Sequence, residues 1–114
     1  MRNAIAGAAL CLAFASSQAV AADASAGKLL FDRHCAECHA PGFGHPGTQQ
    51  LGWTRGAERA VLEQRKDLAA AYVSAIVRNG LVEMPGFRPT EISNANLKVL
   101  AEYVASAGKK RGSR

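Results

Sequence analysis

Cysteine is scarce in this chain, which has three cysteines in 114 residues. Cys11 lies in an apolar stretch near the N-terminus and does not follow a small residue, as a lipoprotein cysteine would. We interpret it as part of a leader that is removed on export. Two cysteines then remain, Cys35 and Cys38, and both belong to one short motif, so no disulfide framework is left.

Long hydrophobic runs are also missing. The uncharged apolar stretch 4–15 is shorter than the roughly 20 residues that a membrane-spanning helix needs. It is followed at 19–21 by Ala-Val-Ala, an A-x-A cleavage site. We expect residues 1–21 to be a signal peptide cut after Ala21 or Ala22, with a retained anchor as the alternative. The prediction is a periplasmic protein with no stable membrane insertion after cleavage.

The body of the chain lacks a strong charge of either sign. The formal net charge is +5, and losing Arg2 with the leader leaves +4. This excess is carried by Lys109, Lys110, Arg111 and Arg114. We expect 109–114 to be a basic disordered tail, with contact to an acidic partner or a membrane as the alternative. No basic stripe has interleaved aromatic residues, so nucleic acid is not an expected partner.

One dense motif stands out, Cys35-Ala36-Glu37-Cys38-His39. Two cysteines three apart, followed at once by histidine, are the attachment signature of haem c. The two thiols add to two vinyl groups on one porphyrin edge, so they must point the same way from one helical turn. His39 then lies under the ring centre and can present a nitrogen to the iron.

Other uses of a Cys-x-x-Cys pair fit this sequence less well. A thioredoxin-like dithiol needs a βαβ context, and nothing near the motif has the pattern of a strand. A zinc site needs four ligands, but the other histidines are His34 and His45, and there is no second cysteine pair. The sequence therefore favours haem attachment.

Met84 is the predicted second ligand of the haem iron. It is the one methionine left after signal removal, it lies between two predicted helices, and Pro85 restricts it to extended geometry. Filling a gap in the core is the alternative role. His45 is the rival ligand, but it is six residues from His39, a short path to the opposite face of the ring. His34 is predicted to lie on a helix surface.

The first and last helices are predicted to cross. The first covers about 25–36, with Ser25 as its N-cap. Gly27 and Phe31 are four residues apart and share one face, where glycine lets another helix approach closely. Tyr103 of the last helix is expected to meet that face.

The limits of the later helices are predicted from their flanking residues. A helix over 68–79 has Asp67 as its candidate cap and Gly80 just after its end. The last helix is expected to begin after Ser93 as N-cap and to end at Gly108. No pattern of a strand, an internal repeat or a second domain is present.

Two segments lack a regular pattern. Glycines and prolines within 41–47 predict turns, and we expect a carbonyl of 44–46 to accept a hydrogen bond from His39. In 48–66 a short helix is expected over 57–65. The candidates for lining a haem edge and binding a propionate are Trp53, Arg55 and Arg59, with plain surface or core positions as the alternative.

The pattern Gly27…Phe31…Cys35-x-x-Cys38-His39…Met84-Pro85…Leu100…Tyr103 resembles that of class I c-type cytochromes over nearly the whole mature chain. The resemblance implies an all-α fold, with three to five helices wrapped around one covalent haem c, formed by residues 22–108. Residues 77–80 leading into 84–87 are also similar to the cytochrome subunit of p-cresol methylhydroxylase-type flavocytochromes. Segment 48–66 is longer than in those subunits.

These features together predict a periplasmic single-electron carrier that is not itself an enzyme. Its haem would be held by Cys35, Cys38, His39 and Met84. The expected partners are a dehydrogenase as donor, a flavoenzyme among the candidates, and a cytochrome or oxidase of a respiratory chain as acceptor. The alternative is a haem peroxidase, or a redox or gas sensor, with a labile sixth ligand. The sequence offers no distal acid–base pair and no signalling domain for those roles.

Overall fold

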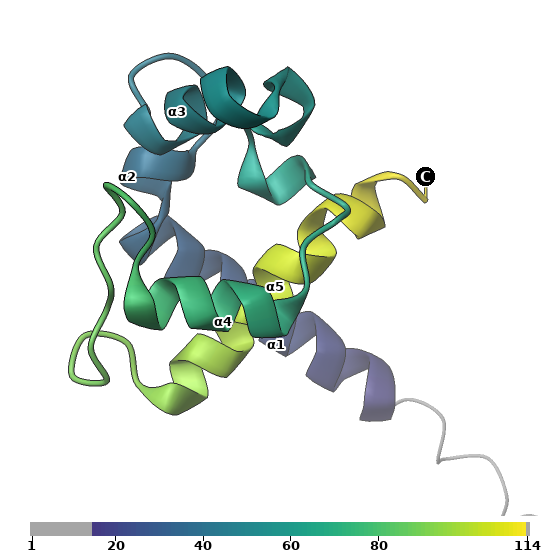
Figure 1. Cartoon of the computed structure of the whole chain (residues 1–114). Coiled ribbons are helices and arrows are strands. Elements are labelled where there is room, and N and C mark those ends of the chain that lie inside the picture. The colour runs from purple at the N-terminus through teal and green to yellow at the C-terminus, as the bar shows by residue number, and fades with distance from the viewer. Residues whose placement is uncertain (1–14, 114) are drawn as a thin grey trace, which may run out of the picture.

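The computed structural model describes residues 15–113, and their side chains from residue 23 onward. Most of the predicted signal peptide lies outside this range. The elements in chain order are α1 (Ala15–His34), α2 (Ala36–His39), α3 (Pro46–Arg55), the 3-10 helices η1 (Ala57–Arg59) and η2 (Leu62–Gln64), α4 (Ala70–Asn79) and α5 (Asn94–Arg111) (Figure 1).

The predicted all-α fold is confirmed. The described part of the chain has five α-helices and no strand; its one isolated bridge pairs Leu81 with Met84. None of the helices within 15–113 is both long and apolar enough to cross a membrane. Figure 1 shows α2 and α3 on one side of the molecule, α4 on the other, and α5 crossing α1.

The crossing of α1 and α5 depends on a glycine. Gly27 is buried, and a Cβ placed on it would collide with the Cβ and Cγ atoms of Tyr103. One turn further, the rings of Phe31 and Tyr103 are tilted against each other with centroids 6.1 Å apart. The predicted contact between the Gly27–Phe31 face and Tyr103 is therefore confirmed, and close backbone approach brings the aromatic pair together.

One hydrophobic core joins α1, α4 and α5. Its buried members are Phe31, Leu68, Val77, Ile92, Leu97, Leu100 and Val104. Each large side chain of this kind contributes about 1.5–3 kcal/mol when removed from water. Cys35 and Met84 are partly buried against the same core. The predicted attachment residue Cys35 and the predicted iron ligand Met84 therefore contact one hydrophobic core.

The predicted start of the first helix was wrong. The helix begins at Ala15, so Ser25 lies in its interior and does not cap it. Alanine is the strongest helix former, and the alanine-rich stretch before Ser25 continues the helix upstream. The helix ends at His34, immediately before the haem motif.

The predicted cap of α4 was also wrong. The helix begins at Ala70, and its N-cap is Ala69, which makes no side-chain cap bond. Asp67 instead accepts two hydrogen bonds from the Arg65 guanidinium, at 2.9 and 2.6 Å. The Asp67 carboxylate thus binds the Arg65 guanidinium through two charged hydrogen bonds and does not cap α4. Gly80, with φ +74°, ends the helix as predicted.

The start of α5 was predicted correctly and its end was not. Ser93 accepts a hydrogen bond from the Asn96 N–H at 3.1 Å, as an N-cap should. The helix continues past Gly108 to Arg111, so the first three residues of the predicted disordered tail 109–114 are helical. Gly108 is buried against the carbonyl of Arg65, which leaves no room for a Cβ, so it is a packing residue.

The secondary structure of segment 46–66 differs from the prediction in two places. Pro46 was predicted to form a turn but is the first residue of α3, a position that suits its fixed φ. The helix predicted over 57–65 is divided into η1 and η2, with a break at 60–61. Segment 48–66 thus consists of short pieces that need tertiary contacts to hold them.

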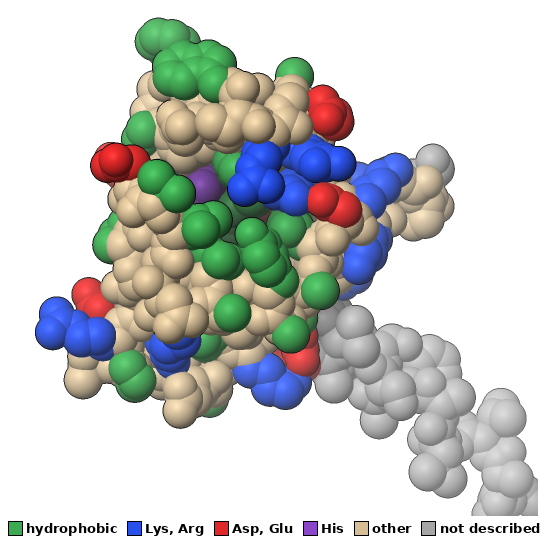
Figure 2. Space-filling view, viewed as in Figure 1, with side chains coloured by type: hydrophobic (Ala, Val, Ile, Leu, Met, Phe, Trp, Pro, Cys, Tyr) green, Lys and Arg blue, Asp and Glu red, His purple; other side chains and the backbone are tan. Residues whose placement is uncertain are grey.

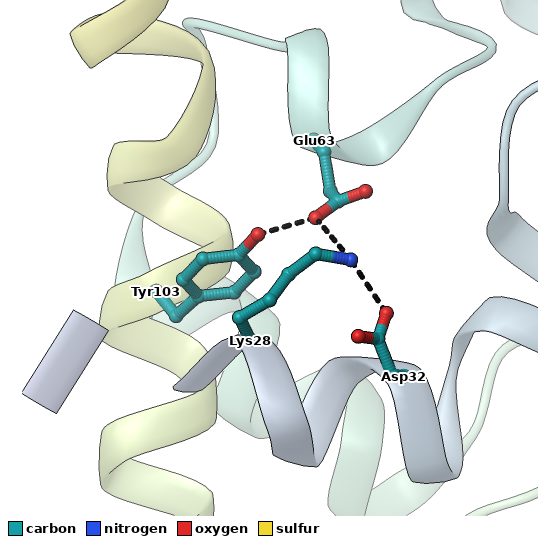
Figure 3. Close-up of polar contacts among 4 residues, drawn as sticks. All are labelled: Lys28, Asp32, Glu63 and Tyr103. Carbon is teal, nitrogen blue, oxygen red and sulfur yellow. Dashed lines mark hydrogen bonds and ion pairs between the residues drawn. The ribbon is translucent and has the colours of Figure 1, made fainter. Parts of the chain in front are cut away.

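A polar network fastens η2 to the α1–α5 pair (Figure 3). Glu63, 6% exposed, accepts a hydrogen bond from the Tyr103 hydroxyl, and Lys28 Nζ lies 3.4 Å from its Oε1. Lys28 also contacts Asp32 at 2.5 Å. Burial, and next the bond to Glu63, raise the pKa of Tyr103 far above its usual value, so the phenol stays a donor.

Candidate functional site

The haem motif folds as its own helical turn. The Cys35 N–H donates to the Phe31 carbonyl at 2.8 Å, which ties the motif to the end of α1. The N–H groups of Cys38 and His39 both donate to the Cys35 carbonyl, at 3.1 and 2.9 Å. Cys35 and Cys38 are therefore neighbours on one turn, as attachment to a single porphyrin edge requires.

The two sulfurs have different surroundings. Cys35 is half-buried against the core, and burial first, then Cys38 and Glu63, raise the pKa of its thiol to about 11. Cys38 is exposed, and both cysteines are free. An apolar setting that disfavours the thiolate suits an uncharged thioether at Cys35. A group bonded to the exposed Cys38 would have that edge at the surface.

His39 has an unusual environment. Its Nδ1 is buried and has no hydrogen-bond partner within the described residues. Burial lowers its pKa, which favours the neutral imidazole that binds metals. Gly47 of α3 lies against the Nδ1–Cε1 edge, where a Cβ would come within 2.6 Å of Cε1. This packing leaves Nε2 as the nitrogen available to a ligand.

The carbonyl expected to accept from His39 is not found within 44–46. The carbonyl of His45 accepts the Gln49 N–H at 3.0 Å, because Pro46 begins a helix there and the first helical bond uses that oxygen. This stretch was predicted to form turns, and a turn prediction does not show that the His45 carbonyl is used by a helix.

His45 and Thr48 close the loop that precedes α3. His45 Nδ1 lies 2.8 Å from the Glu37 carbonyl, and Thr48 Oγ1 donates to the Ala40 carbonyl at 2.9 Å. His45 is thereby held beside α2, on the same side as His39, which weakens its case as a rival ligand. Neither contact was predicted from sequence, because each joins residues eight positions apart through loop geometry.

Met84 lies on a tight turn. The N–H of Leu81 donates to the Met84 carbonyl at 3.0 Å, and the Met84 N–H donates back at 2.9 Å. Val82, 91% exposed, has φ +53°, a conformation that β-branched residues rarely adopt. Gly80 lets the Met84 carbonyl come close, since a Cβ there would lie 2.5 Å from that oxygen.

The base of the Met84 loop is fixed by Phe87. Its N–H donates to the Val77 carbonyl at 2.7 Å, and its carbonyl accepts from Arg78 Nη1 at 3.1 Å. Its ring packs on the core and meets the His34 ring edge-on, with centroids 6.0 Å apart. His34, predicted to lie on a helix surface, thus links the end of α1 to this loop.

Figure 2 shows a hollow between the α3 side and the α4 side of the molecule, lined by hydrophobic side chains, with a histidine at its edge. Basic side chains gather beside it, over the η1–η2 side. The basic residues of that segment are Arg55, Arg59, Arg65 and Lys66. Arg55 and Arg59 are exposed, and Trp53 is 80% exposed, so the predicted haem-edge candidates lie at the surface.

The residues present fit covalent haem. Two free cysteines on one turn, a half-buried imidazole that favours the neutral form and has Nε2 available, an apolar hollow and a thioether on the same core form a suitable donor set. In the described part of the chain, no three His, Cys, Asp or Glu side chains gather as a metal site, which disfavours the zinc alternative.

The sequence has recognisable relatives. The family model for subunit III of cbb3-type cytochrome c oxidase matches residues 22–104. The chain is 38% identical over 80 residues to the cytochrome c subunit of 4-cresol dehydrogenase (hydroxylating) from Pseudomonas putida, covering 70% of this chain but 58% of that protein. It therefore spans less than two thirds of that relative.

Two further relatives are cytochromes c6. The chain is 32% identical over 92 residues to the Synechocystis sp. protein, covering 81% of this chain and 72% of the relative. It is 36% identical over 89 residues to the Leptolyngbya boryana protein, covering 78% and 98%. The crystal structure of p-cresol methylhydroxylase with substrate bound matches 75% of this chain and 96% of its own, with a TM-score of 0.51 and 34% identity.

Proposed function

Since this chain belongs to the cytochrome c family, we propose that it is a periplasmic single-electron carrier whose haem iron is held by His39 and Met84. The family fixes the coarser part of this statement. Its members carry covalent haem c, and the relatives are electron carriers and the cytochrome subunit of a dehydrogenase, which are not catalytic themselves. The assignments of Cys35 and Cys38 to attachment and of His39 and Met84 to ligation are our proposal.

One observation carries the ligand assignment. The α2 turn and the Met84 turn lie far apart in sequence, yet Cys35 and Met84 pack against the same hydrophobic core. A porphyrin attached at α2 would lie close to that core. Met84 is then the thioether that could hold the iron together with His39.

The haem supplies one-electron chemistry when bound, and the protein holds its surroundings constant. Burial favours the neutral form of His39, and the Gly47 backbone packs against its ring. Met84 packs against the core, and the base of its loop is bound to α4 through the Phe87 N–H. Ligands held in this way need little rearrangement between oxidation states, and a thioether favours the reduced iron, so we expect a high potential.

Electrons are proposed to enter and leave at the exposed edge beside Cys38. That side chain lies at the surface, whereas Cys35 is turned to the core. A partner docking there need form only the small, transient interface typical of redox encounters. The peroxidase and sensor alternatives need a labile sixth position, which the packing of Met84 on the core and the bound base of its loop do not favour.

The proposed donor is a dehydrogenase, with a flavoenzyme as the leading candidate, and the proposed acceptor is a cytochrome or an oxidase. The donor proposal is supported by the similarity to a dehydrogenase cytochrome subunit. The acceptor proposal is supported by the match to an oxidase subunit family. The periplasmic location is supported by the apolar stretch and the Ala-Val-Ala site near position 21.

Expression in cells with a c-type maturation system tests the attachment. The expected result is a band that retains haem stain after denaturing electrophoresis, with an intact mass that includes one haem. Changing both Cys35 and Cys38 to Ala should abolish the stained band, whereas Cys11→Ala should not affect it. A mass without haem in the matured wild-type protein would overturn the proposal. N-terminal sequencing of the same sample tests export, since an intact Met1 would mean that the leader is retained.

A further inference from the structure

We infer that Arg78 is a positioning residue for the Met84 sulfur, because its side chain clamps the base of the Met84 loop to the start of α5. The inference rests on the proposed ligation of iron by Met84. It concerns a residue that the ligand motif does not include.

The clamp consists of two hydrogen bonds from one guanidinium. Arg78 lies in the last turn of α4 and is half-buried. Its Nη1 donates to the Phe87 carbonyl at 3.1 Å, and its Nη2 donates to Asn94 Oδ1 at 2.8 Å. Phe87 follows Met84 by three residues, and Asn94 is the first residue of α5. One side chain therefore joins α4, the loop and α5.

The backbone around the clamp is closely packed. The Phe87 N–H donates to the Val77 carbonyl at 2.7 Å, so both polar backbone groups of Phe87 are bound by consecutive residues of α4. Gly86 lies on the Arg78 carbonyl, where a Cβ would come within 2.6 Å of the oxygen. The base of the loop is thus fixed in position relative to α4.

The tip of the loop is less secured than its base. The Leu81–Met84 hydrogen bonds join residues of the turn to each other and not to the rest of the protein. Val82 at the tip is 91% exposed and has a strained φ of +53°. Apart from the packing of the Met84 side chain on the core, the position of the loop is therefore set from its base, where Arg78 acts.

Arginine suits this role better than lysine. Its planar fork reaches two acceptors on different segments at once, whereas an ammonium is a point charge that would satisfy one. Without the fork, the Phe87 carbonyl and the Asn94 amide lose their shared partner. The loop should then open more often, releasing the sulfur while the helices stay folded.

The test uses the oxidised holoprotein and imidazole as an external ligand that competes with Met84. The variants are Arg78→Ala, Arg78→Lys, Asn94→Ala and Asn94→Asp. Arg88→Ala is the matched control, since Arg88 is also near the loop but is 83% exposed and contacts Glu91 at 3.7 Å. The readouts are the rate of imidazole uptake, the weak red band of iron–thioether ligation, and helix content during heating.

Arg78→Ala should raise the rate of imidazole uptake by about ten- to a hundredfold, which is the effect expected for losing a charged hydrogen-bond pair. Arg78→Lys should lie between Arg78→Ala and wild type. Asn94→Ala should have a smaller effect, and Asn94→Asp should keep the wild-type rate because it retains the acceptor. In Arg78→Ala the red band should be lost at a lower temperature than the helices, and Arg88→Ala should match wild type.

Two results would overturn the inference while leaving Met84 ligation in place. One is an unchanged imidazole rate in Arg78→Ala. The other is an equal fall in the temperature at which the red band is lost and the temperature at which the helices unfold, because that would make Arg78 a general stabilising residue. A wild-type spectrum without the red band is a different failure: it would refute ligation by Met84 itself, and the inference with it.

Discussion

Gly27 in α1 and Tyr103 in α5 are in such close contact that a single added methyl group would overlap the tyrosine side chain. Gly27→Ala should therefore destabilise the protein by up to about 2 kcal/mol, since overpacking costs about 1–3 kcal/mol and the gain in helix propensity is about 1 kcal/mol. Thermal unfolding followed by circular dichroism measures this change.

Gly52→Ala is the matched control for that substitution. Gly52 lies within α3, and an added Cβ would meet the Ala60 Cβ at an ordinary 3.5 Å. The same change should here stabilise the protein by up to about 1 kcal/mol. If both variants shift stability in the same direction, the close crossing of α1 and α5 is not the cause.

Tyr103→Phe should destabilise the fold by about 1–2 kcal/mol, because Glu63 would lose a hydrogen-bond donor while remaining buried. Tyr72→Phe is the control, since Tyr72 is 49% exposed and its hydroxyl has no hydrogen bond among the described residues. Chemical denaturation of the two holoproteins measures the difference. Equal stability of Tyr103→Phe and wild type would show that the bond contributes nothing net.

Asp67 should make stability fall slightly in acid. The hydrogen bonds from Arg65 lower the pKa of Asp67 to about 2, below the roughly 3.9 of an unfolded chain. A lowered pKa gives stability that is present above about pH 4 and is lost as the pH falls towards 2. Since Asp67 is exposed, the effect should be below about 1 kcal/mol.

Asp67→Asn removes this titration. The unfolding free energy of the variant should change less than that of wild type between about pH 5 and pH 2.5, a range set by the two pKa values. Identical pH dependence in the two proteins would argue against a bound Arg65–Asp67 pair in solution.

The parts of the fold that were predictable from sequence depend on neighbouring residues. Two cysteines three apart and followed by histidine predicted a single helical turn, and the motif does fold as α2 with Cys35 as its N-cap. The cap at Ser93 is a local hydrogen bond, and the Gly27–Phe31 pattern is a property of one helix face. For such features, the sequence near the residue contains the whole physical cause.

The parts that were not predictable depend on which of several possible partners a residue contacts, and most of these partners are distant in sequence. Asp67 is an acceptable cap by type, but Arg65 engages it. Glycine is common at the ends of helices, yet Gly108 is buried against the Arg65 carbonyl and the helix continues past it. The role of Arg78 depends on Asn94, sixteen positions away. Arginine in a last helical turn is common, and the sequence alone does not show what its side chain reaches.

The red absorption band and midpoint potential of Met84→Ala, measured on the holoprotein, decide whether Met84 ligates the haem iron. If Met84 is the sixth ligand, the variant should retain covalent haem but lose the band, the iron should become high-spin or bind external ligands, and the potential should fall. Met84→His should restore a low-spin state at a potential still below wild type, and the exposed control Val82→Ala should keep the band. A Met84→Ala protein with the wild-type spectrum and potential would contradict the account, and His45 or a non-protein ligand would then have to hold the sixth position.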